Sequence, residues 1–195
     1  MPLNSIKSTG HLHNHQDIIY NEMEKTLTSR ILHQGRSFSF KTDEVQLQNG
    51  KRTIRDIVDH PGAVAIVPIL DDGRILLVRQ FRYSAGKELL EIPAGTLEKD
   101  EAPDTCARRE LKEETGYTAG SMKKILSMYM APGYSSEVIH LFFATALKAG
   151  EQITEEDESI SLELYGPEEF LEMMEENMIE DAKTIAGVLS YLTRN

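Results

Sequence analysis

The stretch that decides the fold runs from Gly95 to Tyr117 and reads GTLEKDEAPDTCARRELKEETGY. It predicts a helix over about 102–115, because Pro103 suits the first turn of a helix and Gly116 suits the position just past its end. The helix carries an unusual density of acidic side chains. Its charge pattern, rather than its hydrophobic face, is therefore the first clue to function.

Helical spacings of three and four residues place Glu110, Glu113 and Glu114 on one side of this helix. Crowded carboxylates repel one another, and a hard divalent ion that takes oxygen ligands, Mg²⁺ or Mn²⁺, relieves that repulsion. Arg109 can pair with Glu113 one turn on, or with Glu101 at the start of the helix. The three acids alone favour a solvated helix face with ion pairs. The ordered pattern G-x5-E-x7-R-E-L-x-E-E-x-G is far more specific and favours a metal site.

Apolar runs on both sides of this segment predict a mixed arrangement of strands and helices. Before it, the unbroken run over 63–70 predicts a buried strand, and two shorter runs predict strands over 75–78 and 89–92. After it, we expect strands over 122–130, 138–147 and 159–165, and helices over 167–177 and 180–193. Strands that enclose a helix in this order indicate an α+β fold.

The first third of the chain has a different character. Residues 26–60 contain short runs with period-two alternation and a hairpin signal at Gln48–Lys51, which predict a small antiparallel sheet. So small a sheet is not stable alone, so it must pack on the main domain or on a partner chain. We therefore expect a loose polar tail over 1–25, this sheet over 26–60 and a catalytic domain over 61–195.

Composition and charge exclude several classes of protein. The 195 residues carry a formal net charge of −11, which argues against general binding to nucleic acid. The acidity is local, because residues 151–181 hold 13 acids and no Lys or Arg, and the remainder is slightly basic. The single Cys106 excludes a disulfide framework and a Cys-rich zinc site. No apolar run reaches the ~20 residues of a membrane span, and no signal-peptide core is present, so we expect a cytoplasmic protein.

The segment from Gly95 to Tyr117 resembles the Nudix box, and every fixed position of that pattern is met. Tyr117 is a soft departure, since the family usually has an aliphatic residue there. The resemblance implies an α/β/α sandwich with a mixed sheet, and a Mg²⁺-dependent hydrolase of nucleoside diphosphates linked to another group. Leu77–Arg82, Leu90–Gly95 and Pro132, which lies 15 residues beyond the box, are similar to the ADP-ribose pyrophosphatase branch of the family.

This resemblance implies roles for particular residues. The main-chain carbonyl of Ala94 and the carboxylates of Glu110 and Glu114 would bind Mg²⁺, with Mn²⁺ as a possible substitute, and Glu113 would act in the same catalytic cluster. Arg82 and Arg55 look like the contacts to the diphosphate and ribose. A guanidinium fork suits a diphosphate better than the point charge of a lysine does.

The general base stays open at this point. The acidic run at 155–158 resembles a loop that, in some members, supplies a catalytic Glu and a further metal ligand, which would be Glu156 and Glu158. Glu137, in the loop after Pro132, is a rival as base or as substrate contact. A solvated acidic loop explains the run at 155–158 equally well. Because the chain has no Trp, Phe38 and Phe40 are candidates for adenine contacts, with core packing as the alternative.

The prediction that follows is an enzyme that hydrolyses ADP-ribose to AMP and ribose 5-phosphate. The alternatives are a hydrolase of another nucleoside diphosphate sugar, such as a GDP-sugar, a module that binds ADP-ribose without cutting it, and an interaction protein built around the acidic segment. In the branch that the chain resembles, the N-terminal sheet exchanges across a two-fold dimer and completes each substrate site. The resemblance therefore implies a homodimer.

Overall fold

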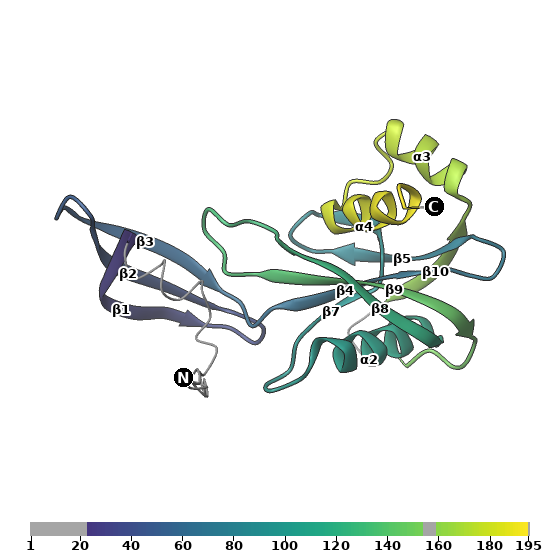
Figure 1. Ribbon diagram of the computed structural model, residues 1–195, viewed down its shortest axis with the longest axis horizontal. Helices are drawn as coiled ribbons and strands as arrows, with labels where there is room; N and C mark the ends of the chain where they lie inside the picture. The colour runs from purple at the N-terminus through teal and green to yellow at the C-terminus, as the bar shows by residue number, and fades with distance from the viewer. Residues whose placement is uncertain (1–22, 154–158, 195) are drawn as a thin grey trace, which may run out of the picture.

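The structure, a computed structural model, describes residues 23–153 and 159–194 (Figure 1). Its strands are β1 (Glu24–Gln34), β2 (Ser39–Leu47), β3 (Arg52–Asp59), β4 (Ala63–Pro68), β5 (Ile75–Arg82), β6 (Lys87–Glu91), β7 (Ala94–Thr96), β8 (Thr118–Tyr129), β9 (Val138–Lys148) and β10 (Ile160–Tyr165). Its helices are α2 (Pro103–Thr115), α3 (Pro167–Glu175) and α4 (Ala182–Leu192). No helix in the described part of the chain is long and apolar enough to cross a membrane.

The body of the molecule has three layers. Two sheets, with strand orders β7-β4-β9-β8 and β10-β5-β6, lie between α2 on one side and α3 and α4 on the other (Figure 1). Strands β4 and β9 are parallel and their neighbours are antiparallel, so the larger sheet is mixed. The α+β sandwich predicted from the sequence is confirmed.

The position of strand β4 in the fold accounts for its unbroken apolar sequence. Val64 and Ile66 pack with α2, whereas Ala65 and Val67 pack with the cluster that includes α3 and α4. Both faces of the strand are therefore buried, and no polar position is needed on either face. Helix α2 begins after Ala102 and ends at Gly116, whose φ of 75° is left-handed, as its glycine predicted.

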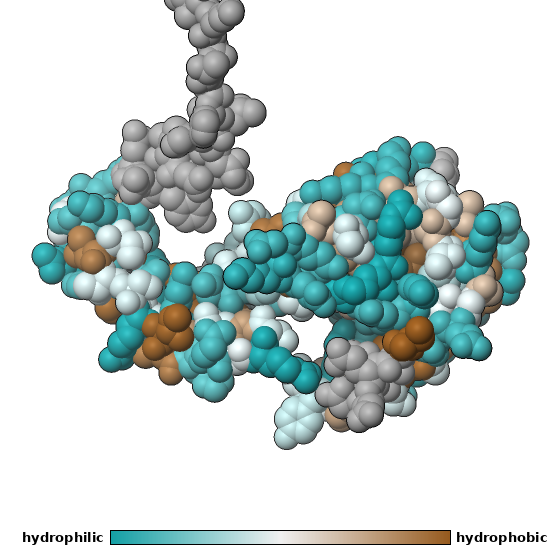
Figure 2. Space-filling view, turned by 90° about the horizontal axis from the view of Figure 1, so that it is seen from below, coloured by the Kyte–Doolittle hydropathy of each residue, from teal (hydrophilic) through white to brown (hydrophobic). Residues whose placement is uncertain are grey.

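The N-terminal sheet, formed by β1, β2 and β3, extends away from the body (Figure 1). Among its described residues, Val45 is the one apolar side chain classed as buried. Several large apolar side chains of this sheet and its connections are exposed, namely Ile31, Leu32, Phe38, Phe40 and Ile54. Figure 2 shows brown hydrophobic patches on this part of the surface. Such a sheet lacks a core of its own.

One main-chain junction ties this sheet to the body. Val58 N–H donates to the carbonyl of Tyr134 at 2.8 Å, and Ser136 N–H donates to the carbonyl of Val58 at 3.0 Å. The Oγ of Ser136 accepts a further hydrogen bond from the His60 amide at 2.9 Å. The end of β3 is thereby joined to the loop between β8 and β9, which is the loop that carries Glu137.

Candidate active site

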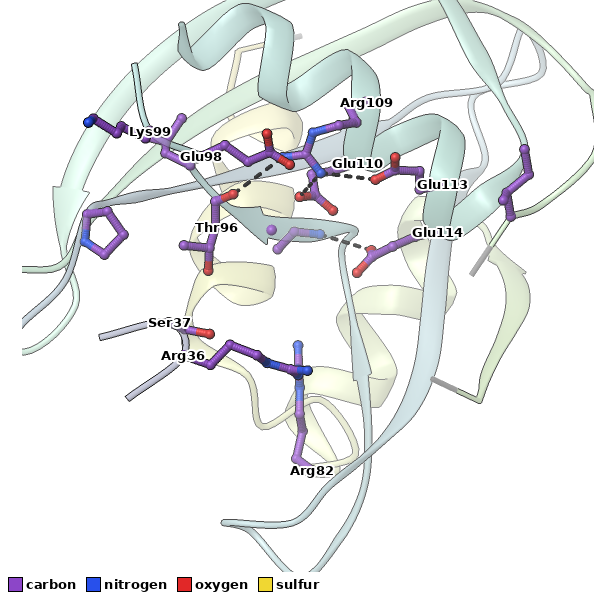
Figure 3. A pocket seen from close by; sticks show the side chains of 15 residues that line it. Arg36, Ser37, Arg82, Thr96, Glu98, Lys99, Arg109, Glu110, Glu113 and Glu114 are labelled. Carbon is purple, nitrogen blue, oxygen red and sulfur yellow. Dashed lines mark hydrogen bonds and ion pairs between the residues drawn. The ribbon is translucent and has the colours of Figure 1, made fainter. Parts of the chain in front are cut away.

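A cleft of two adjoining lobes lies where α2, β7, the end of β5 and the β1–β2 turn meet. The lobes have volumes of about 890 Å³ and 650 Å³. Ser37, Arg82 and the three residues of β7 line both lobes, so the lobes form one continuous site. The larger lobe, drawn in Figure 3, is lined by all three acidic residues predicted for the metal cluster; they are Glu110, Glu113 and Glu114.

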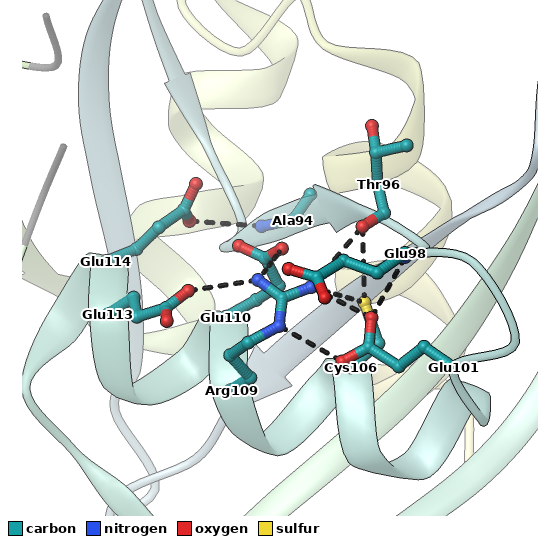
Figure 4. A network of polar contacts seen from close by, with 9 residues as sticks. All are labelled: Ala94, Thr96, Glu98, Glu101, Cys106, Arg109, Glu110, Glu113 and Glu114. Carbon is teal, nitrogen blue, oxygen red and sulfur yellow. Dashed lines mark hydrogen bonds and ion pairs between the residues drawn. The ribbon is translucent and has the colours of Figure 1, made fainter. Parts of the chain in front are cut away.

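Arg109 organises the acidic cluster (Figure 4). Its guanidinium donates two hydrogen bonds to Glu101, at 3.0 and 2.9 Å, which form a fork-to-fork pair. Its Nη1 also contacts Glu110 at 2.6 Å and Glu113 at 3.0 Å. The sequence predicted a pair with either Glu101 or Glu113, and the structure contains both. Arg109 therefore restricts the positions of three carboxylates at once.

Glu114 is held by a hydrogen bond from strand β7. Its Oε2 accepts a hydrogen bond from the main-chain N–H of Ala94 at 3.1 Å, and the residue is buried. Between Ala94 and the helix, Gly95 leaves the space that the Glu110 carboxylate fills, because a Cβ at Gly95 would lie 1.9 Å from Glu110 Cδ. Strand β7 and helix α2 thus approach as closely as they do because residue 95 has no side chain.

The donor set fits a hard divalent cation. Carboxylate oxygens and a main-chain carbonyl are the ligands that Mg²⁺ and Mn²⁺ prefer, and Ala94 lines the same lobe as the three glutamates. In the described part of the chain, no three acidic, His or Cys side chains converge closely enough to chelate one ion as they stand. The residues present therefore suit the ion by chemistry and placement, with Glu110 and Glu113 drawn toward Arg109 instead.

The ion pairs shift two proton equilibria in the cluster. Hydrogen bonds from Arg109 lower the pKa of Glu101 to about 2, so Glu101 is a permanent anion that anchors the arginine. The hydrogen bonds with Glu101, followed by the nearby charge of Glu110 and the hydrogen bond with Glu113, raise the pKa of Arg109 above its ordinary value. Burial raises the pKa of Cys106, which lies on the buried face of α2, so this thiol is a structural side chain and not a nucleophile.

Arg82 lies where the two lobes join, as its predicted role requires. It donates to both oxygens of Glu91 at 2.7 Å, and Lys183 Nζ contacts the same carboxylate at 2.5 Å. Burial opposes the ionisation of Glu91, but the two cations outweigh it and hold its pKa below the ordinary value. Glu91 and Lys183 were missed from the sequence, which gave no signal that residues 92 apart would pair.

Arg36 was also missed. It lies in the β1–β2 turn, and it lines the larger lobe together with Arg82. In Figure 3 the two side chains point toward one another from different elements, on the opposite side of the lobe from the carboxylates of α2. The lobe therefore has an acidic wall and a basic wall, an arrangement that suits an anion bound through a cation.

The smaller lobe receives the loop between β8 and β9. Glu137 lines this lobe and is half-buried, and Tyr134 and Phe38 contribute aromatic faces to it. Of the two phenylalanines considered from the sequence, Phe38 is therefore at the cleft and Phe40 is not among its lining residues. Both side chains are exposed, so neither packs in the core of this chain.

Two groups of predicted residues are not brought to the cleft. Arg55 lies on β3 and pairs with Glu24 through two hydrogen bonds, at 3.0 and 2.7 Å, and it lines neither lobe within one copy of the chain. Its substrate contact stays a prediction. Glu156 and Glu158 lie outside the described residues, so their roles as base and metal ligand also stay predictions.

Comparisons with known proteins agree with this geometry. The chain is 42% identical to an ADP-ribose pyrophosphatase of Bacillus subtilis over 171 residues, which cover 87% of this chain and 92% of that protein. It is 40% identical to a methanol dehydrogenase activator of Bacillus methanolicus, covering 85% and 90% of the two chains. A GDP-mannose pyrophosphatase of Yersinia enterocolitica is 38% identical, covering 68% and 74%.

The fold has been seen before in a solved structure described as an ADP compounds hydrolase. The two structures superpose with a TM-score of 0.77 at 22% identity, covering 88% of this chain and 93% of the other. The family model for the NUDIX domain matches residues 59–186, which include the box helix, Arg82 and the start of α4. With the box pattern intact and its carboxylates gathered in one cleft, the chain belongs to the Nudix hydrolases.

Proposed function

We propose that this Nudix hydrolase cleaves the diphosphate bond of ADP-ribose, using Mg²⁺, to give AMP and ribose 5-phosphate. The observation that carries the proposal is the larger lobe, where Glu110, Glu113 and Glu114 face Arg36 and Arg82 across one cavity. A relative named ADP-ribose pyrophosphatase, 42% identical over most of both chains, supports this substrate. The second lobe is large enough to take a further part of a nucleotide sugar.

The residues that would hold the ion are Glu110, Glu114 and the carbonyl of Ala94, with Glu158 as a further ligand. When bound there, Mg²⁺ or Mn²⁺ would neutralise phosphate charge and lower the pKa of a coordinated water. Arg109 and the amide of Ala94 keep Glu110 and Glu114 at the wall of this lobe. Because Glu110 now pairs with Arg109, binding of an ion would require its carboxylate to turn toward that ion.

The chain's own cations would bind and orient the substrate. Arg82 keeps its guanidinium at the junction of the lobes through Glu91, and Arg36 reaches the same lobe from the β1–β2 turn. The proton of the attacking water would pass to a carboxylate brought by a loop. The candidates are Glu137, which lines the second lobe, and Glu156; Glu113 would assist within the cluster on α2.

We also propose that the active form is a homodimer assembled through the N-terminal sheet. The apolar side chains exposed on this sheet would be buried if the sheet packed against the same sheet of a second copy in a two-fold symmetric dimer. Such an arrangement would bring a partner's residues toward the cleft and gives Arg55 a route to a substrate that it does not have within one chain.

A substrate profile tests the proposal. Purified protein with Mg²⁺ or Mn²⁺ is given ADP-ribose and GDP-mannose, and the products are separated by chromatography. We expect AMP and ribose 5-phosphate, with kcat/KM higher for ADP-ribose. Faster cleavage of GDP-mannose would move the assignment to GDP-sugars, for which the Yersinia relative provides a precedent. Tight binding of ADP-ribose without cleavage would make the protein a binding module instead.

A further inference from the structure

We propose that Lys183, acting through Glu91, is a positioning residue that orients the guanidinium of Arg82 toward the substrate's diphosphate. The inference rests on the proposed function, because it takes Arg82 as a substrate contact. It assigns a role to a residue at the start of the C-terminal helix α4, which lines the smaller lobe. The evidence is the burial and the order of the contacts between the three residues.

The burial of Lys183 has no explanation in the fold alone. Its side chain is 10% exposed, and it occupies the second position of α4, where the positive end of the helix dipole disfavours a cation. Two carboxylates compensate, with Nζ 2.5 Å from Glu91 and 3.0 Å from Asp181. An apolar side chain would fill this position without those costs, and departures from local rules concentrate at functional sites.

All three residues line the smaller lobe, and Glu91 links the other two. Glu91 is 1% exposed and binds both Lys183 and Arg82, whereas the Arg82 side chain is 40% exposed at the junction of the lobes. Arg82 uses its Nε and Nη2 for Glu91, and a guanidinium has five N–H donors. The buried pair thus fixes the plane of the guanidinium while leaving it donors for a ligand in the cleft.

Asp181 pairs with Lys183 through one oxygen, but the hydrogen bonds that hold the start of α4 use other atoms. Asp181 caps α4 by accepting a hydrogen bond from the Thr184 amide at 2.9 Å. The Thr184 hydroxyl accepts a hydrogen bond from the Ile92 amide at 2.8 Å, which ties α4 to the end of β6. Because these bonds do not involve the ammonium group, α4 should keep its place when that group is removed. The effect on Arg82 can then be separated from an effect on folding.

The experiment is a double-mutant cycle on ligand binding. The affinity of the full chain for ADP-ribose is measured by calorimetry with EDTA present, so that turnover does not occur, for wild type, Lys183→Met, Arg82→Ala and the double variant. We expect Lys183→Met to weaken binding about tenfold, the order expected when one hydrogen bond within a charged network is lost. In the Arg82→Ala background the same substitution should have little further effect.

Controls separate positioning from folding. Lys87→Met is a matched variant, since Lys87 joins β6 to Glu180, just before α4, without contacting Glu91, and it should bind as wild type does. Lys183→Arg keeps the charge and should retain most of the affinity. If Lys183→Met does not fold, the double variant Glu91→Gln/Lys183→Met removes both buried charges, and it should show the same loss of affinity.

The outcomes distinguish this proposal from the proposed function. Wild-type affinity in Lys183→Met, or in the double variant where only that folds, overturns the positioning role. If Lys183→Met weakens binding as much in the Arg82→Ala background as in wild type, the positioning role is also overturned, because a loss that does not depend on Arg82 indicates a general structural effect. Wild-type protein that binds ADP-ribose without cleaving it overturns the proposed activity alone, and wild-type protein that does not bind it overturns both.

Discussion

The body of the molecule and its N-terminal sheet are both built mainly from strands, yet they keep their polar and apolar groups in opposite places. In the body, β4 is buried on both faces, and charged side chains such as Glu91 and Glu114 lie inside with partners. In the N-terminal sheet, apolar side chains such as Phe40 and Ile54 are exposed. The core of the body therefore holds most of the buried apolar side chains, whereas several large apolar side chains of the sheet are exposed.

This difference assigns separate tasks to the two regions. Chemistry should depend on residues of the body, and assembly should depend on residues of the sheet. They meet at the β1–β2 turn that brings Arg36 to the cleft and at the junction of Val58 with the loop before Glu137. The predictions below test how strictly the tasks are divided.

The largest effect is expected in the body, from Glu114→Gln. The amide oxygen can still accept the hydrogen bond from Ala94, so the fold should persist, but the lost charge weakens the metal site. We expect kcat/KM to fall about 10³-fold, or about 4 kcal/mol of transition-state stabilisation. Steady-state hydrolysis of ADP-ribose with Mg²⁺ measures it, and Lys112→Gln on the exposed side of α2 is the control. A rate within tenfold of wild type would contradict the metal assignment.

The next effect concerns the two candidates for the general base, tested by the variants Glu137→Gln and Glu156→Gln. A general base contributes at least about 10²-fold, so at least one of the two variants should lose that much in kcat. KM should change less, because the proton transfer occurs after binding. The comparison of the two variants identifies the base. If neither variant loses activity, the base is in the cluster on α2, and Glu113→Gln becomes the variant to measure.

In the sheet, the double substitution Phe40→Ser/Ile54→Ser should act on assembly. The strand register places both side chains on one face, since Phe40 lies opposite Val58 and Ile54 opposite Glu44. Loss of this apolar area should convert the dimer to monomers, with activity reduced about tenfold as the partner's contribution is lost. Light scattering gives the mass, and Leu171→Ser on α3 is an equally exposed apolar control. A wild-type chain that is monomeric and fully active would refute the dimer.

The smallest effect is the pH dependence of the Glu101–Arg109 pair. The folded-state pKa of Glu101 is about 2, against an ordinary value of 4.5, so its contribution to stability is present above pH 4.5 and is lost as the pH falls toward 2. Glu101→Gln should lower Tm by about 4 °C at pH 7, and the difference should narrow below pH 4.5. Calorimetry of both proteins from pH 3 to 8 measures it. A difference in Tm between the two proteins that grows as the pH falls below 4.5 would contradict this prediction.

Much of the body could be predicted because its signals are local. The box helix was predicted over 102–115 and lies at Pro103–Thr115, since a proline and a glycine mark its ends. Arg109 was predicted to pair with Glu113 one helical turn on or with Glu101 at the start of the helix, and the structure contains both pairs. Residues 94–96 form β7, which the sequence analysis did not predict, because three residues after a proline carry too little pattern to identify a strand.

The features that could not be predicted are mostly contacts between residues far apart in the sequence. Lys183 reads as an ordinary lysine on a terminal helix, and only the packing of α4 beside β6 brings it to Glu91. Arg36 enters the cleft because of where the N-terminal sheet attaches, which no local pattern encodes. Arg55 was predicted to contact the substrate, and within one chain its side chain pairs with Glu24 of β1. Local sequence patterns therefore do not predict the contacts of side chains whose neighbours come from distant parts of the chain.

Gly95 offers a practical marker for other sequences of this kind. A single methyl group there would overlap the Glu110 carboxylate where it now lies, so a chain could keep every acidic residue of the box and still have to hold Glu110 in a different position. A survey that counts only glutamates would classify such a chain as an enzyme. Checking residue 95 first would separate relatives that retain the whole catalytic geometry from those that retain only its charges.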